Sequence, residues 1–235
     1  MKRTPVVHSN ASNLQVLYED NHLIVVNKRP GDIVQGDKTG DAPLNEVVKE
    51  YIKIKYNKPG NVFLGVVHRL DRPTSGIVVF ARTSKALPRL NALFSQGKTK
   101  KTYWAIVKNS PNKASATLTH WLVRNPKQNK SYAHNSEVPN SKIAILSYRI
   151  LKELDNYTHL EIDLKTGRHH QIRAQLAAIG CHIKGDLKYG AQRSNPNGSI
   201  HLHARSLEFE HPVKKEPLQF IAPTPSEDSL WKIVD

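Results

Sequence analysis

The apolar residues of this chain come in short runs bounded by turn-forming residues, and this pattern limits its fold more than any other feature. Leu23 to Val26 form one such run between His22 and Asn27, with the length typical of a buried strand. Two of the runs are separated only by a short segment with Asp155 and Asn156, which favours a hairpin. The segments that we expect to form strands are 23–26, 77–80, 102–107, 144–151, 158–164, 202–209 and 218–222.

Helical periodicity is confined to three segments. Apolar residues recur at i, i+3, i+4, i+7 and i+8 over 44–52 behind Pro43, and a second helix is expected over 87–94, with Pro88 in its first turn. A third should cover 171–179 and end at Gly180. We expect a loop at 53–62, and loops with short strands over 109–140. Strands outnumber helices, so the sequence predicts an α+β fold with a largely antiparallel mixed sheet flanked by helices and loops.

Length and composition predict one soluble domain. The chain has 235 residues, and residues 1–13 are small and polar, so we expect a flexible tail followed by a single domain over 14–235. No run approaches the roughly 18 apolar residues of a membrane-spanning helix, and the N-terminus lacks the apolar run of a secretory signal. The one cysteine, Cys181, cannot form an internal disulfide. A reducing cytoplasm is therefore the expected location.

The positive charge is concentrated in one part of the sequence. The 35 Lys and Arg residues against 20 Asp and Glu give a net charge of +15, which favours a polyanionic partner. Residues 72–136 contain twelve Lys and Arg residues and no Asp or Glu, so this window carries +12 of the +15. A solvated face kept for solubility is the alternative, although solubility does not require every acid to be absent over such a span.

Two polar segments place reactive side chains where a strand or a helix is expected to begin. In the segment 68–76, Asp71 lies between Arg69 and Arg72 just before an expected strand, where cations would keep a carboxylate ionised and suited to act as a nucleophile. A turn Asp that binds local backbone amides fits the pattern equally well. The segment 166–173 carries its donors at the start of a helix and is typical of an anion or base-edge binding surface. A solvated helix cap is the alternative there.

A third segment, 100–107, joins basic residues to aromatic ones. Lys100 and Lys101 precede Tyr103 and Trp104, a pattern that suits phosphate attraction combined with base stacking. The two rings must point to opposite faces of a strand, so at most one can face a nucleotide and the other belongs to the core. The twelve histidines show no recognisable zinc spacing, so we expect no metal.

These motifs together resemble one known family. HRLDRPTSG at 68–76 resembles the HRLDxxTSG signature of the RluA-type pseudouridine synthases, TGRHHQIR at 166–173 is similar to their TGRxHQIR motif, and Lys101, Tyr103 and Ala105 match their KxYxA strand. The likeness extends from Leu17 to Pro223. One departure lies at Pro30, one position later than in the family's NKPxG motif. About 16 residues precede this region, too few for the S4-type RNA-binding domain of some members.

The resemblance implies an isomerase that converts uridine in structured RNA, rRNA or tRNA, to pseudouridine without a cofactor. It implies that Asp71 is the nucleophile or electrostatic catalyst, that Tyr103 stacks on the uracil as candidate base, and that Arg173 pairs with Asp71. The target base must be flipped out of its helix, and Arg69 would fill the gap that it leaves. The expected RNA-binding residues are Arg69, Arg72, Lys98, Lys100, Lys101, Arg168 and His170.

Two other classes remain open from the sequence. One is a non-catalytic RNA-binding protein that keeps a synthase-like fold, and the other is a nucleic-acid glycosylase with a catalytic Asp. Asp71, Tyr103 and Arg173 are all present, which favours the synthase over the first class. We expect a monomer that binds an RNA stem-loop and does not bind a membrane.

Overall fold

The computed structural model describes residues 5–36 and 40–235, and the chain divides into two compact units. The central unit comprises residues 100–203, and the flanking unit comprises residues 5–99 and 204–233. Strand β11 (Leu202–Glu210) begins in the central unit and continues in the flanking unit. Each unit is described in turn.

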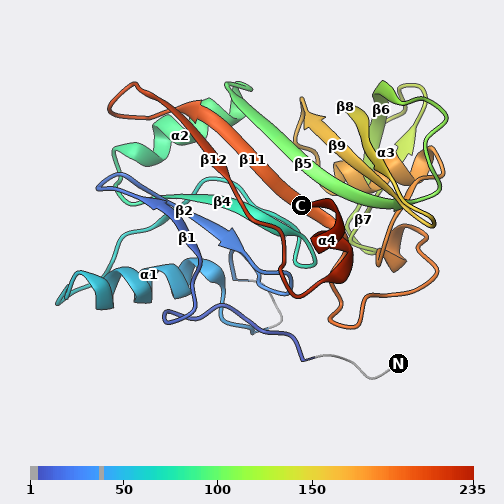
Figure 1. Cartoon of the computed structure of the whole chain (residues 1–235). Coiled ribbons are helices and arrows are strands. Elements are labelled where there is room, and N and C mark those ends of the chain that lie inside the picture. The colour runs from blue at the N-terminus through green and yellow to red at the C-terminus, as the bar shows by residue number, and fades with distance from the viewer. Residues whose placement is uncertain (1–4, 37–39) are drawn as a thin grey trace. The chain divides into compact units, whose positions relative to one another are not determined.

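The flanking unit contains a sheet with a helix on each face. Its strands follow the order β1 (Val16–Glu19), β2 (Leu23–Lys28), β4 (Ser75–Ala81) and β11, with β3 (Gly65–Val66) on β4 and β12 (Pro217–Ile221) on β11. All six residues of β2 are buried because both faces of the sheet are covered. Leu23 and Val25 pack with helix α2 (Ala86–Ser95), whereas Ile24 and Val26 pack with α1 (Leu44–Lys55). The two helices therefore lie on opposite sides of β2 and β4 (Figure 1).

The central unit contains an antiparallel sheet with one helix packed on it. Its strands follow the order β5 (Thr99–Lys108), β9 (Thr158–Leu164), β8 (Lys142–Glu153), β6 (Ser115–Asn125) and β7 (Lys130–His134), and β10 (His182–Ile183) pairs with β5. Ile172 and Leu176 of helix α3 (Gln171–Ala178) join Leu160 and Ile162 of β9 in one core cluster. A 3-10 turn, η1 (Leu187–Tyr189), follows β10.

The α+β class and most of the expected elements are confirmed. The strands expected at 144–151 and 158–164 form the antiparallel pair β8 and β9, and those expected at 202–209 and 218–222 form the pair β11 and β12. Pro88 lies in the first turn of α2, and Gly180, with φ +77°, follows the end of α3. Five short elements were not expected from the sequence: β1, β3, β10, η1 and α4 (Ser229–Val234).

Two expected loops are wrong in part. Helix α1 continues to Lys55, because the breakers in the following segment act only from Asn57, which has φ +46°. The segment 109–140 contains the eleven-residue strand β6 rather than only short strands. From Ser115 to His120, exposed side chains alternate with half-buried or buried ones, which is typical of a strand with one covered face.

The domain boundaries stay predictions. They are the flexible tail over 1–13 and the single domain over 14–235. In the expected tail, the backbone N–H of Ser9 donates to Asp32 at 3.0 Å, and His8 Nδ1 lies 3.3 Å from the same carboxylate. None of the helices in the described part of the chain has the length and apolar character needed to cross a membrane.

Candidate active site

Asp71 lies in a tight turn directly before β4. The backbone N–H of Thr74 donates to the carbonyl of Asp71 at 3.0 Å, which closes the turn. Upstream, His68 Nε2 accepts a hydrogen bond from the Val79 N–H at 3.0 Å, and the His68 ring stacks on Phe94 with 4.6 Å between centroids. The loop that carries Asp71 is therefore attached at both ends to regular structure.

Gly76 is required by the close approach of β4 to β11. Its φ of +113° is a conformation that side chains with a Cβ rarely adopt. A Cβ at this position would also collide with the main chain of Ala204, including its carbonyl oxygen and its nitrogen. Gly76 is the second residue of β4, so the strand that follows the Asp71 turn begins with a glycine that no other residue can replace without moving the backbone.

Lys28 is a buried lysine beside the Asp71 turn, and no role could be assigned to it from the sequence alone. Its side chain is 1% exposed, and Nζ donates to the carbonyls of Arg29, Arg72 and Thr74 at 2.9, 3.1 and 2.7 Å. Burial lowers the pKa of Lys28 to about 7, against the charges of Asp32 and Asp71, which raise it. A lysine at the end of a fully buried strand was the signal that could have indicated this role.

The loop with the displaced proline reaches the same turn. The backbone N–H of Gly31 donates to the carbonyl of Arg72 at 2.8 Å, so this carbonyl accepts from both Gly31 and Lys28. The departure at Pro30 therefore leaves the 28–31 segment in contact with the residues that follow Asp71. Together these contacts fix the backbone that carries Asp71, the candidate nucleophile.

Tyr103 and Trp104 lie on opposite faces of β5, as the strand geometry requires. Tyr103 is half-buried and packs against the core cluster that also contains Ala105 and residues of α3. Trp104 contacts the buried His159 edge to face, with 4.7 Å between centroids. The expectation that Trp104 is a core residue is met only in part, because its side chain remains half-buried.

Arg173 lies in α3, on the side of the central sheet that also carries Tyr103. Its side chain is 5% exposed and forms a bidentate ion pair with Asp186 through Nε and Nη2, at 2.7 and 2.8 Å. Gln171 is also buried, and its Oε1 accepts from the Thr166 hydroxyl and the Arg168 N–H. A solvated cap is therefore excluded for Arg173 and Gln171. Asp186, which stands in a segment (185–190) that also resembles the family but has no role assigned from the sequence, is a second functional candidate.

The expected RNA-binding residues differ in exposure. Four of them are exposed: Arg69, Lys98, Lys100 and Arg168. Arg72 forms an ion pair with Asp41 at 2.5 Å, and burial lowers the pKa of the half-buried Lys101. His170 is half-buried directly before α3 and has a left-handed backbone conformation, with φ +53°.

The candidate residues are distributed over both units. Asp71 belongs to the flanking unit, whereas Tyr103 and Arg173 belong to the central unit, where the structure places them on one face of the sheet. The acid-free window 72–136 is divided in the same way, after Thr99. The assembly of Asp71 with Tyr103 and Arg173, and the formation of one basic face, stay predictions.

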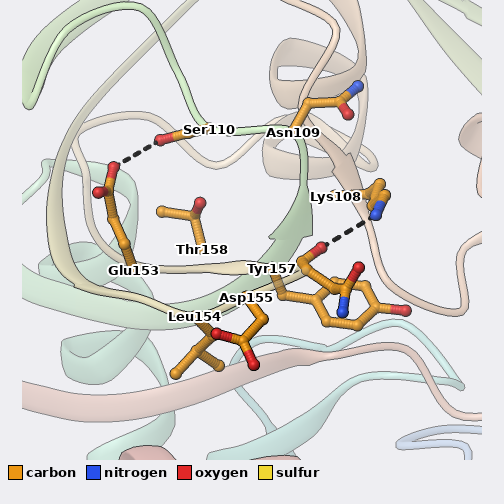
Figure 2. A pocket seen from close by; sticks show the side chains of 9 residues that line it. Lys108, Asn109, Ser110, Glu153, Leu154, Asp155, Tyr157 and Thr158 are labelled. Carbon is orange, nitrogen blue, oxygen red and sulfur yellow. Dashed lines mark hydrogen bonds between the residues drawn. The ribbon is translucent and has the colours of Figure 1, made fainter.

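A pocket in the central unit contains none of the motif residues. It has a volume of about 340 Å³ and lies at the turn between β8 and β9, where the Ser110 hydroxyl donates to Glu153 and Lys108 Nζ donates to the carbonyl of Asn156 (Figure 2). Acidic and basic side chains share this pocket, which does not suit a polyanion. Across residues 5–36 and 40–235, no group of three or more His, Cys, Asp or Glu side chains is arranged to hold a metal ion.

Comparison with known proteins agrees with these motifs. An uncharacterized RNA pseudouridine synthase of Synechocystis sp. is 32% identical over 91% of this chain and 66% of its own length. Ribosomal large subunit pseudouridine synthase D of Vibrio cholerae is 32% identical over 91% of this chain and 68% of its own length. The chain thus spans about two thirds of the length of these relatives.

The fold has matches among solved structures. Human RNA Pseudouridylate Synthase Domain Containing 4 is 24% identical, with a TM-score of 0.77 and 92% of each chain covered. The sequence family described as RNA pseudouridylate synthase matches residues 22–178, which is more than half of this chain. The chain belongs to the RNA pseudouridylate synthase family, whose members are RNA-modifying isomerases.

Proposed function

We propose that this protein isomerises specific uridines in structured RNA to pseudouridine, with Asp71 as the catalytic carboxylate. The observation that carries the proposal is the Asp71 turn, which the buried Lys28 fixes through the carbonyls of Arg72 and Thr74. These hydrogen bonds hold the backbone around Asp71 in one conformation, and a reacting group requires such a fixed position. The family match over residues 22–178 supports the reaction class.

The reaction exchanges one bond of the uracil for another. The bond between C1′ and N1 breaks, the base turns, and C5 bonds to C1′ while the C5 proton leaves and N1 gains a proton. No oxidant, reductant or cofactor is consumed. Asp71 attacks C1′ or C6, or assists loss of uracil, and all three routes use the same residues.

Tyr103 and Arg173 have separate tasks in this proposal. Tyr103 stacks on the flipped uracil, and its phenol is the candidate base for the C5 proton. Arg173 pairs with Asp71 and keeps that carboxylate ionised as RNA covers it. Arg69 holds the place of the flipped base in the RNA stack.

The RNA should bind through cations and be selected by its folded shape. Lys98, Lys100, Lys101 and Arg168 attract phosphates. Arg72 and His170, which lie within the motifs at 68–76 and 166–173, add further contacts to the RNA. A stem-loop that offers an easily unstacked uridine is the expected target. The name of the Vibrio cholerae relative makes large-subunit ribosomal RNA the first substrate to test, before tRNA. We propose that the protein works as a monomer in the cytoplasm.

Nucleoside mapping tests the proposal. Pseudouridine is mapped in total RNA from cells with and without the gene, and purified protein is then incubated with unmodified ribosomal RNA and tRNA transcripts. The proposal requires at least one pseudouridine that disappears with the gene and returns on incubation. Unchanged uridine would indicate a non-catalytic RNA-binding protein, and an abasic site would indicate a glycosylase.

A further inference from the structure

Asp186 holds the guanidinium of Arg173 from outside helix α3. It lies in the turn between β10 and η1 and is 2% exposed, while Arg173 is 5% exposed. Its two carboxylate oxygens accept from two different nitrogens of Arg173, at 2.7 and 2.8 Å. Such a fork fixes both the plane and the direction of the guanidinium, which a single hydrogen bond does not.

Tyr189 supplies a second contact from the same turn. Cζ of Arg173 lies 5.0 Å from the centroid of the Tyr189 ring, and this ring is 5% exposed. The Tyr189 oxygen accepts from the Ser131 N–H of β7 at 2.8 Å and lies 3.0 Å from Nδ1 of His170. The ring is thus attached to β7 on one side and to the start of α3 on the other.

The start of α3 is fixed at the same place. His170 has φ +53°, a conformation that is uncommon for a residue other than glycine, and its ring stacks on His169 with 3.8 Å between centroids. His169 in turn lies 2.9 Å from the Ser131 hydroxyl. The first turn of α3, which carries Arg173, is therefore held by contacts to both η1 and β7.

We propose that Asp186 and Tyr189 are positioning residues, which hold the Arg173 guanidinium in the orientation that the isomerisation needs. The inference rests on the proposed function, because that function gives Arg173 its task. A guanidinium has five N–H donors, so the fork to Asp186 is compatible with Arg173 binding a second carboxylate or an RNA oxygen. A charge that is oriented before the reaction stabilises the transition state without reorganisation.

Three variants test the proposal on full-length protein. Asp186→Asn removes the charge, Asp186→Glu keeps the charge but displaces the guanidinium by about one methylene, and Tyr189→Phe keeps the ring and removes its hydroxyl. Single-turnover rates at saturating RNA are measured at a temperature where circular dichroism shows each variant to be folded. We expect both Asp186 variants to lose roughly 10²-fold in rate with RNA affinity within about threefold. Tyr189→Phe should show a smaller loss of rate in the same pattern.

Asp20→Asn is the matched control. Asp20 also binds a buried basic side chain, with His211 Nε2 at 2.9 Å, but it lies between β1 and β2 in the flanking unit. This variant should lose stability and keep its single-turnover rate. If Asp186→Asn does not fold, the test rests on Asp186→Glu, because this variant keeps the buried charge pair with Arg173. A folded Asp186→Glu protein that reacts at the wild-type rate would overturn the proposal.

A spectroscopic measurement separates this inference from the proposed function. The Nε–H resonance of Arg173 is assigned by its loss in Arg173→Lys, and it should shift and exchange faster with solvent in Asp186→Asn but not in Asp20→Asn. If wild-type protein makes no pseudouridine, the proposed function fails while this resonance still reports the fork. If wild-type protein is active and the resonance does not change in Asp186→Asn, the positioning role alone is wrong.

Discussion

Asp71 is the residue on which the proposed chemistry depends. Asp71→Asn keeps the size of the side chain and removes its charge, so we expect pseudouridine formation to be lost. RNA affinity should change by less than about tenfold, or roughly 1.4 kcal/mol, because many cations share the phosphate contacts. Turnover is measured by nucleoside analysis and affinity by filter binding.

Asp155→Asn is a control for this substitution, since Asp155 is exposed at the turn between β8 and β9. It should leave both turnover and affinity unchanged. Measurable turnover by Asp71→Asn, after mass spectrometry has excluded deamidation back to Asp, would remove Asp71 from the mechanism.

Lys28 gives the protein a pH-dependent stability. Its pKa is about 7 in the folded chain, against an ordinary 10.5, so the unfolded chain binds more protons between these two values. Stability must therefore rise with pH through this window, by at most about 1.4 kcal/mol per pH unit from this group. Urea unfolding at pH 7, 8 and 9 should show wild-type protein gaining stability relative to Lys28→Met. Parallel pH profiles for the two proteins would show that Lys28 does not titrate there.

At the scale of elements, the two faces of β5 should carry one catalytic ring, Tyr103, and one structural ring, Trp104. Tyr103→Phe keeps the contact with the core cluster and removes the phenol, so RNA should bind nearly normally while most turnover is lost. Trp104→Phe should instead lower the free energy of unfolding, because it weakens the contact with His159. The two variants are compared by single-turnover kinetics and by thermal unfolding. An exchange of these effects would mean that Trp104, not Tyr103, meets the uracil.

The elements that the sequence predicted well are those whose pattern is local. The apolar run of β2 and the periodicity of α1 are read from adjacent residues, and both elements begin in the structure where they were expected, at Leu23 and Leu44. The length of strand β6 was underestimated because the Ser and Asn content of segment 109–140 is typical of loops, although Leu118 and Leu122 already show the alternation of β6. Composition outweighed periodicity in that segment, and periodicity was the better guide.

At the scale of the whole molecule, the distribution of charge should control RNA binding. Replacing Lys98, Lys100 and Lys101 together with Gln removes three cations from the acid-free window. Each phosphate contact contributes about 0.7 to 0.9 to the slope of log K against log salt, so the slope should flatten by about two to three units. All RNAs should be weakened alike, whereas Arg69→Ala should leave the slope near its original value and reduce turnover.

A matched triple variant tests whether position matters in addition to net charge. Lys53, Lys58 and Lys232 are exposed and lie outside the window. Their replacement with Gln changes the net charge by the same amount and should leave the salt slope nearly intact. Equal slopes for the two triple variants would place the RNA on another part of the surface.

The candidate site was predictable only where its signal lies in one short segment. Asp71, Tyr103 and Arg173 stand in motifs that can be read directly. Lys28 and Asp186 could not be assigned their partners, because the contacts from Lys28 to Thr74 and from Arg173 to Asp186 exist only after the chain has folded. A buried charge shows its partner only in the tertiary structure.

The close approach at Gly76 has a consequence for genetics. The atoms that a Cβ would meet belong to the main chain of Ala204, which every amino acid shares, so changing the side chain at 204 cannot relieve the collision. A suppressor screen begun from Gly76→Ala should therefore return true revertants at codon 76 and no compensating partner at codon 204. In a saturation library, substitutions at codon 76 should lose all function, and this level can serve as the reference against which substitutions at other positions are scored.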